Sequence, residues 1–194
     1  MTSIEHLLFQ QPWPEGEFRF FQLGFVVDDL LVAASRWVKV FGVGPFHVLP
    51  PMEPTCTYRG TESAIALQIA VAQAGPVQIE LIEQRCDRAS VYRDLFAKGD
   101  SGFHQLCTVS RDYEGTKARY ADLGYELVTE IFGQGVHTCF FDTVADFGFF
   151  TEVAEDAPGF LEQLAGIART CAEWDGTDPV RILTRQGYRT PKQP

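Results

Sequence analysis

The sequence predicts an α+β fold made of two tandem copies of a β-α-β-β-β unit. Residues 21–27 (FQLGFVV) and 104–110 (HQLCTVS) are alike, and each segment is followed by acidic residues, a helical run and a glycine. The two copies also end alike, because 77–83 and 149–155 each carry a glutamate in mid-strand and a second one three residues later. These matches indicate an internal duplication. Four polar residues occupy matching places in it: Gln22, Glu80, Gln105 and Glu152.

The first copy begins with a strand at about 18–27 and a helix over 30–41. The helix is predicted because apolar residues recur at intervals of three and four, and Gly42 follows where a helix would end. A short strand (46–49), a loop containing Pro50, Pro51 and Pro54, and a strand over 77–84 come next. A short helix over 90–98 connects the two copies.

Residues 63–74 alternate clearly between large and small side chains, which indicates a strand with two different faces. We expect the large residues to pack under the helix and the small face to border a ligand cavity. Gln68 lies on the small face and is a candidate substrate contact. The alternative is that the small face packs tightly against another backbone. The large face holds Ile65, Leu67, Ile69 and Val71, and the small face holds Ala64, Ala66, Gln68, Ala70 and Ala72.

The second copy is predicted as a strand (102–109), a helix (112–123) and strands near 125–131, 136–143 and 149–155. We expect the strand at 136–143 to line the cavity with His137, Cys139 and Phe141. A helix after Pro158 and an irregular tail follow. The predicted division is therefore an N-terminal arm (1–17), a first unit with its connector (18–100), a second unit (101–156), and a C-terminal helix and tail (157–194).

Composition excludes several classes of function. The chain has 194 residues and a formal net charge of −10, and it holds no cluster of Lys and Arg. Nucleic acids and anionic membranes are therefore not expected as partners. No segment approaches the ~20 apolar residues that span a bilayer, and the first residues do not resemble a signal peptide. The five cysteines are widely spaced without a CxxC pair, which favours a reducing cytoplasm over a disulfide framework.

The duplicated plan, the segment 23–30 (LGFVVDDL) leading to 41–46 (FGVGPF), the phrase 79–83 (IELIE) and the phrase 102–105 (GFHQ) resemble the vicinal oxygen chelate superfamily. The closest resemblance is to its glyoxalase and methylmalonyl-CoA epimerase branch, and it covers about 18–155. The resemblance implies that each βαβββ module curls into half of an incomplete barrel around a central cavity.

The resemblance also implies a divalent metal held by Gln22, Glu80, Gln105 and Glu152. Gln105 departs from the family pattern, because a histidine is expected at its place. Two amides and two carboxylates form an oxygen-only set that suits Mg²⁺ or Mn²⁺ better than zinc. We therefore expect either a weakly held divalent metal or none. His104 precedes Gln105 and would face the covering helix unless a bulge shifts the strand register.

Family chemistry implies proton transfer beside a carbonyl group. Glu152 and Glu80 are the candidate bases, since aromatic surroundings raise the pKa of a carboxyl group by desolvation. His137 is the third catalytic candidate, with an edge position in solvent as its alternative. The candidate substrate contacts are Tyr58, Gln68, Phe141 and Phe150.

The leading functional hypothesis is an isomerase, epimerase or lyase acting on an apolar carbonyl compound. The second is a metal-free protein of the same fold that binds a small molecule. A ring-cleaving dioxygenase is the third, and it is disfavoured because no histidine stands at the matched positions. The expected partner is a small-molecule substrate, and a homodimer is compatible with the fold.

Overall fold

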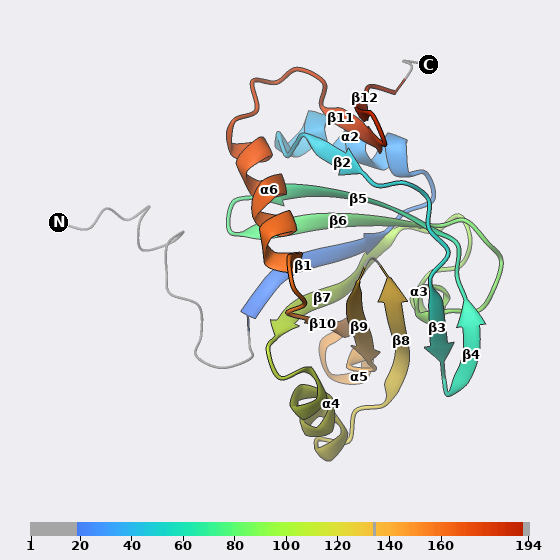
Figure 1. Cartoon of the computed structure of the whole chain (residues 1–194). Coiled ribbons are helices and arrows are strands. Elements are labelled where there is room, and N and C mark those ends of the chain that lie inside the picture. Colours follow the sequence, from blue (N-terminus) through green and yellow to red (C-terminus); the bar gives the residue numbers. More distant parts are fainter. Residues whose placement is uncertain (1–18, 134, 192–194) are drawn as a thin grey trace.

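The structure, a computed structural model, describes residues 19–133 and 135–191. The predicted N-terminal arm, with His6, therefore lies outside the described residues. The described chain forms one twelve-stranded sheet in the order β12-β11-β2-β5-β6-β1-β7-β10-β9-β8-β3-β4. The sheet is curled and stays open, because its edge strands β12 and β4 do not pair with each other (Figure 1). The predicted α+β fold with an incomplete barrel is confirmed.

The first half of the sheet has the strand order β2-β5-β6-β1. Its helix begins at Asp29, whose side chain accepts a hydrogen bond from the backbone of Val32, and it ends at Gly42 with a φ of 67°. Both ends match the sequence prediction. The elements of this half are β1 (Arg19–Val26), α2 (Leu30–Phe41), β2 (Phe46–Val48), β5 (Leu67–Ala74) and β6 (Val77–Gln84), followed by the connecting helix α3 (Val91–Leu95).

The second half has the corresponding strand order, β7-β10-β9-β8. The halves meet where β1 pairs with β7 in antiparallel fashion, and within each half the first and last strands pair in parallel. The division of the chain into four domains stays a prediction. The elements of this half are β7 (Gly102–Ser110), α4 (Tyr113–Asp122), β8 (Leu127–Gly133), β9 (Val136–Phe141), α5 (Val144–Phe147) and β10 (Phe150–Glu155).

A hairpin replaces part of the long strand that was predicted over 63–74. Strand β3 (Thr55–Tyr58) turns at Arg59 and Gly60, both with positive φ, into β4 (Thr61–Ala64). β3 then pairs with β8 of the other half. Pro50, Pro51 and Pro54, which precede the hairpin, predict a loop in this part of the chain. The last of them, Pro54, stands immediately before the first residue of β3, where it removes no ladder hydrogen bond.

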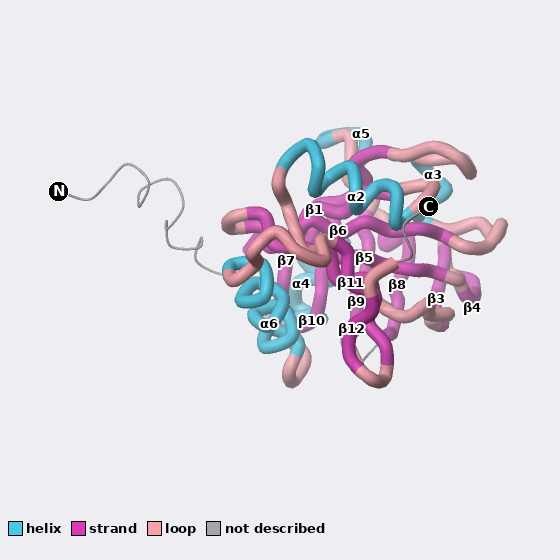
Figure 2. The backbone as a smooth tube through the Cα atoms, turned by 90° about the horizontal axis from the view of Figure 1, so that it is seen from above, coloured by secondary structure: helices cyan, strands magenta, loops and turns pink. Residues whose placement is uncertain are grey.

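The C-terminal segment is ordered rather than irregular, which corrects a second prediction. Helix α6 (Phe160–Ala172) lies across the sheet, and β11 (Val180–Thr184) pairs in parallel with β2 (Figures 1 and 2). Strand β12 (Gly187–Arg189) pairs with β11. The tail therefore lengthens the outer edge of the first half, as the β3–β4 hairpin lengthens the outer edge of the second.

The two faces of β5 are opposite to the expectation. Ala70 and Ala72 are fully buried in one cluster with Leu30 and Ala34 of α2, whereas the large residues of β5 line the cavity. The reason is volume. Helix α2 also brings Trp37 to this layer, so only a small-residue face fits beneath it at native packing density.

The faces of β9 are likewise opposite to the expectation. Val136 and Thr138 line the cavity, whereas Cys139 and Phe141 are buried on the other face with Tyr113 of α4. The residues of β9 alternate between two faces as predicted, but helix α4 covers the face that was expected to border the ligand. In the described residues, no helix is long and apolar enough to cross a membrane.

Candidate functional site

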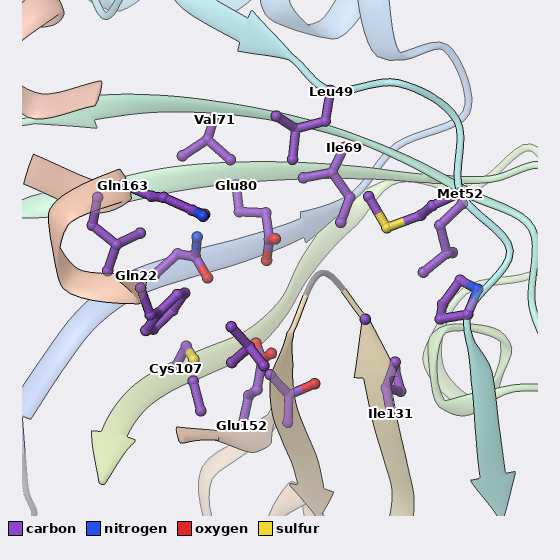
Figure 3. A pocket seen from close by; sticks show the side chains of 18 of the residues that line it. Gln22, Leu49, Met52, Ile69, Val71, Glu80, Cys107, Ile131, Glu152 and Gln163 are labelled. Carbon is purple, nitrogen blue, oxygen red and sulfur yellow. The ribbon is translucent and has the colours of Figure 1, made fainter. Parts of the chain in front are cut away.

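A cavity of about 190 Å³ lies on the concave side of the sheet. Both halves contribute strands to its walls, and α6 covers it with four side chains, Phe160, Gln163, Leu164 and Ile167 (Figure 3). Phe160 also makes an edge-to-face contact with Phe21 of β1, at 5.9 Å between ring centroids. Most of the remaining lining is apolar: Leu49, Met52, Pro54, Leu67, Ile69, Val71, Ile131, Val136 and Ala154.

Three of the four predicted metal ligands line this cavity. Gln22 projects from β1, Glu80 from β6 and Glu152 from β10, so that the two carboxyl groups approach from opposite walls (Figure 3). Gln22 and Glu152 are buried, while Glu80 is partly exposed to the cavity. Because none of the described lining residues is Lys or Arg, no cation within the cavity compensates the two carboxyl groups.

The fourth predicted ligand, Gln105, lies behind the two carboxyl groups and connects them. Its amide nitrogen is 3.2 Å from Glu80 Oε2 and 3.3 Å from Glu152 Oε2. The amide lies across Gly24 of β1, where a Cβ atom would come within 2.3 Å of the Gln105 side chain. Gly24 therefore leaves the space that the amide occupies, and Gln105 contacts two of the other three matched residues.

Burial and proximity change the ionisation of this pair. Desolvation raises the pKa of Glu152 to about 7. The pKa of Glu80 is raised well above its usual range, first by desolvation and then by the charge of Glu152. Two carboxyl groups joined by one amide in a poorly solvated cavity disfavour the doubly ionised state. At neutral pH we therefore expect the pair to hold about one proton. Cys107, which also lines the cavity, stays a neutral thiol because burial raises its pKa.

His104 is fully buried beside this group. The register of β7 against β1 shifts between Gly24 and Phe25, and His104 is the extra residue at that point. The bulge that the sequence analysis named as a condition is therefore present. The ring stacks on Phe150 at 5.1 Å, and its Nδ1 contacts the side-chain amide of Gln105. His104 thus faces Gln105 rather than the cavity.

The structure does not bring the other candidate residues to the cavity. Their side chains are engaged elsewhere, and their predicted substrate contacts have no geometric support here. His137 lies at the surface 2.9 Å from Glu155, the Tyr58 hydroxyl donates to Asp94 at 2.6 Å, the Gln68 amide donates to the carbonyl of Leu49 at 3.0 Å, Phe141 stacks on Tyr120 at 4.4 Å, and Phe150 stacks on His104.

Several lining residues were absent from the sequence-based site. Cys107 had an available signal, since it follows Gln105 by two positions and such residues share one face of a strand. Thr138 alternates with His137 and was excluded by the inverted face of β9. Gln163 lies on α6, and nothing in its sequence neighbourhood indicated that this helix would cover the cavity.

The donor set limits the metals that could bind. In the described chain no group of three or more His, Cys, Asp and Glu side chains could hold a metal ion. Gln22, Glu80, Gln105 and Glu152 could present only oxygens to a cation, which suits Mg²⁺ or Mn²⁺ and disfavours zinc. For Gln105 this would require its amide oxygen, rather than its nitrogen, to face the carboxyl groups.

Comparison with known proteins identifies the class to which this fold and site belong. Residues 21–141 match the family model described as the glyoxalase/bleomycin resistance protein/dioxygenase superfamily. The match covers more than half of the chain. The protein therefore belongs to this superfamily, as the resemblance to vicinal oxygen chelate proteins predicted. No curated protein matches the chain.

Solved structures show the same fold at low identity. Methylmalonyl-CoA epimerase from Mycobacterium tuberculosis is 19% identical with a TM-score of 0.54, over 81% of this chain and 98% of that one. The Streptomyces coelicolor methylmalonyl-CoA epimerase in complex with 2-nitronate-propionyl-CoA is 18% identical with a TM-score of 0.52, over 72% and 95%. At such identity the likeness shows the fold alone.

Proposed function

We propose that the protein catalyses proton transfer beside the carbonyl group of a small apolar molecule, as an isomerase, epimerase or lyase. One observation supports this most, namely two carboxyl groups, Glu80 and Glu152, that face one apolar cavity and have raised pKa values. A carboxyl group with a pKa of about 7 can both remove and return a proton near neutral pH.

The two carboxyl groups divide the work between them. The ionised group removes the proton beside the carbonyl, the electron pair of the broken C–H bond forms a C=C bond, the π pair of the C=O bond moves onto oxygen, and an enolate forms. The protonated group then delivers its hydrogen to carbon. Because Glu80 and Glu152 lie on opposite walls, removal and return can occur on opposite faces of the substrate. We assign the Gln22 amide as the hydrogen-bond donor to the enolate oxygen.

The lining favours an uncharged substrate. Aliphatic and aromatic side chains form most of the wall, and the described lining residues include neither Lys nor Arg. Phosphate or sulfonate groups inside the cavity would have no counter-charge and would meet two acidic side chains. We therefore propose a compact ketone, aldehyde or ester rather than a charged thioester conjugate.

If Mg²⁺ or Mn²⁺ binds, the oxygens of Gln22, Glu80, Gln105 and Glu152 are the donors we assign, and the ion would supply additional stabilisation of the enolate. Such an ion would need both carboxyl groups ionised, so the acid and base roles assigned above are those of the metal-free pair.

The test is exchange of substrate α-hydrogen with deuterated water, followed by NMR across a panel of small ketones, aldehydes and esters. We expect Glu152→Gln to slow exchange by the ~10²–10⁴-fold typical of general-base loss while leaving ligand affinity within a few-fold. Glu155→Gln is the matched control, because Glu155 lies on the same strand outside the cavity. Equal exchange rates in wild type and Glu152→Gln would remove Glu152 from the mechanism.

A second candidate function is binding without catalysis. It is favoured by Gln105, whose amide contacts both carboxyl groups. The rest of the cavity lining is then mostly apolar. In that case the same compounds bind, no exchange occurs in any variant, and Glu152→Gln leaves affinity within a few-fold.

Cytoplasmic location and homodimer formation stay predictions. The described cysteines are free thiols, which supports a reducing compartment. Cell fractionation and sedimentation velocity test the two predictions separately.

A further inference from the structure

Helix α6 forms one wall of the cavity, although it lies outside residues 21–141, which match the family model. The four side chains that it places on the cavity are three or four residues apart, so they share one face of the helix. We call this the inner face of α6, and its members are Phe160, Gln163, Leu164 and Ile167. The family match therefore gives no information about this wall.

Three contacts hold α6 over the cavity. The ring of its first residue packs on Phe21 of β1, at 5.9 Å between centroids. In the middle of the helix, the buried side-chain amide of Gln78 on β6 donates to the carbonyl of Leu164 at 3.3 Å. Near its end, Cys171 Sγ accepts a hydrogen bond from the backbone of Gln73 on β5 at 3.2 Å. The sheet thus positions the inner face, and that face limits the shape of a ligand.

Gln163 is the one polar side chain on the inner face, and Figure 3 shows it pointing from α6 into the cavity. It is exposed, and within the described part of the chain its amide has no hydrogen-bond partner, so a ligand can reach it. A glutamine amide has donors and an acceptor but no charge. It can therefore bind a hydroxyl or carbonyl group and gives no Coulombic attraction to an ion.

The apolar members of the inner face restrict the size of the ligand. Leu164 and Ile167 are partly buried and border a cavity of about 190 Å³. Sites for drug-sized molecules usually have ~300–1,000 Å³, so a few carbon atoms in this wall occupy a large share of the available space. Shortening one of these side chains should admit a longer ligand.

We propose that α6 determines which ligands the cavity takes. Gln163 binds a second, uncharged oxygen group of the ligand, and Leu164 and Ile167 limit the length of its apolar part. The ligand class is a short aliphatic ketone or aldehyde that carries a hydroxyl or carbonyl group apart from the reacting carbonyl. The choice of carbonyl compounds rests on the proposed function, whereas binding can be measured without turnover.

The first experiment measures dissociation constants by NMR titration for methyl ketones from methyl ethyl to methyl hexyl ketone, each with and without a hydroxyl group on its last carbon. For each pair, the ratio of the two constants gives the preference for the hydroxyl group. We expect Gln163→Leu to reduce this preference by roughly two- to tenfold, the value of one net hydrogen bond. Glu162→Leu is the matched control, because it places the same side chain one residue away and outside the cavity lining.

An unchanged preference in Gln163→Leu would overturn the proposal, and so would an equal reduction in Glu162→Leu. These outcomes are separate from those of the proposed function. If the hydroxyl preference depends on Gln163 but no α-hydrogen exchanges in the wild type, the ligand selection stands and proton transfer fails.

The second experiment uses the unsubstituted ketones of the same series. Wild-type affinity should rise about fourfold with each methylene group until the chain fills the cavity. Ile167→Ala should move this limit to longer chains by about one or two methylene groups, and Ile167→Val should move it less in the same direction. Leu161→Ala is the control, because Leu161 is 41% exposed on the same helix and does not line the cavity. One common limit in all four proteins would contradict the role of α6.

Discussion

The two halves of the sheet share one strand order but fill the space between sheet and helix in opposite ways. In the first half α2 brings Leu30, Trp37 and Val38 to the interface. The β5 residues that face them are the small, fully buried Ala70 and Ala72. In the second half the strand side of the layer is large. There α4 contributes Tyr113 and the partly buried Tyr120, and β9 contributes Cys139 and the large Phe141. The size of the side chains on a strand face therefore differs between the two halves, since it must fit the helix that packs against that face.

The two matched glutamines, one in each half, also have different surroundings. Gln22 follows Phe21 and lies in the cavity wall, whereas Gln105 follows the buried His104 and lies behind the wall. Matching positions in the sequence therefore do not have matching surroundings. The Gln105 amide of the second half is held by buried neighbours, whereas the Gln22 amide of the first half lines the cavity.

The largest effect is expected from removing the bulk that the second half carries on its strand. Phe141 is almost completely buried and stacks on Tyr120 of α4, so Phe141→Ala should cost about 3–5 kcal/mol of unfolding free energy. Phe132→Ala on β8 is the control, because Phe132 is 53% exposed and should cost under about 1 kcal/mol. Urea denaturation measures both. Similar losses would mean that β9 does not carry this layer.

The next effect is expected from adding bulk in the first half. Ala70→Leu should destabilise by about 1–3 kcal/mol, because the helix above it leaves no room. Val71→Leu adds one methylene on the cavity side and should cost less than about 1 kcal/mol while weakening ligand binding. If Ala70→Leu were tolerated and blocked binding instead, the alanine face would border the cavity after all.

A smaller effect should come from Gly24, where the halves touch. Gly24→Ala would press on the buried Gln105 amide, and we expect a loss of roughly 1–2 kcal/mol together with a changed apparent pKa of the carboxyl pair. Gly133→Ala is the matched control, because the nearest atom to its Cβ would be Pro54 Cβ at 3.6 Å, an ordinary contact. An unchanged pKa in Gly24→Ala would show that the amide position is unimportant.

The smallest expected effect is a change in how steeply the free energy of unfolding varies with pH. Since folding raises the pKa of Glu152 from 4.5 to about 7, the stability from its protonated form is full below about pH 4.5 and is lost as pH rises through 7. Glu152→Gln should remove this loss, by at most about 1.4 kcal/mol per pH unit. His47 and His104, whose pKa values are lowered, give the opposite slope in both proteins and cancel in the difference. Parallel stability curves would contradict the raised pKa.

The fold and the polar residues of the site could be predicted from the sequence because their sequence phrases occur twice. The phrases around Gln22 and Gln105, and around Glu80 and Glu152, occur in matching order, and the family resemblance implied that these four residues meet at one cavity. Which face of β5 or β9 meets a helix could not be derived in this way. Alternation gives two faces but does not name them, and the choice depends on the side chains of a helix distant in sequence.

The hairpin at 55–64 and the tail strands were missed for a related reason. Both pair with strands far away in the chain, β8 and β2, and their local sequence contains prolines or turn residues that favour loops. The interaction of His104 with Gln105 depends on a bulge, which adds one residue and leaves no periodic signal.

Helix α6 closes the cavity but stands outside the span that matches the family model, which ends at residue 141. Glu152 of β10 also lies beyond residue 141, whereas Glu80 lies within the matched span, and α6 follows both carboxyl groups in the sequence as one contiguous stretch. Recombination or directed evolution could therefore exchange this covering helix as one segment and change which molecules enter the cavity, while Glu80 and Glu152 stay in place. Selectivity for the ligand and the pair of carboxyl groups could thus change independently of each other.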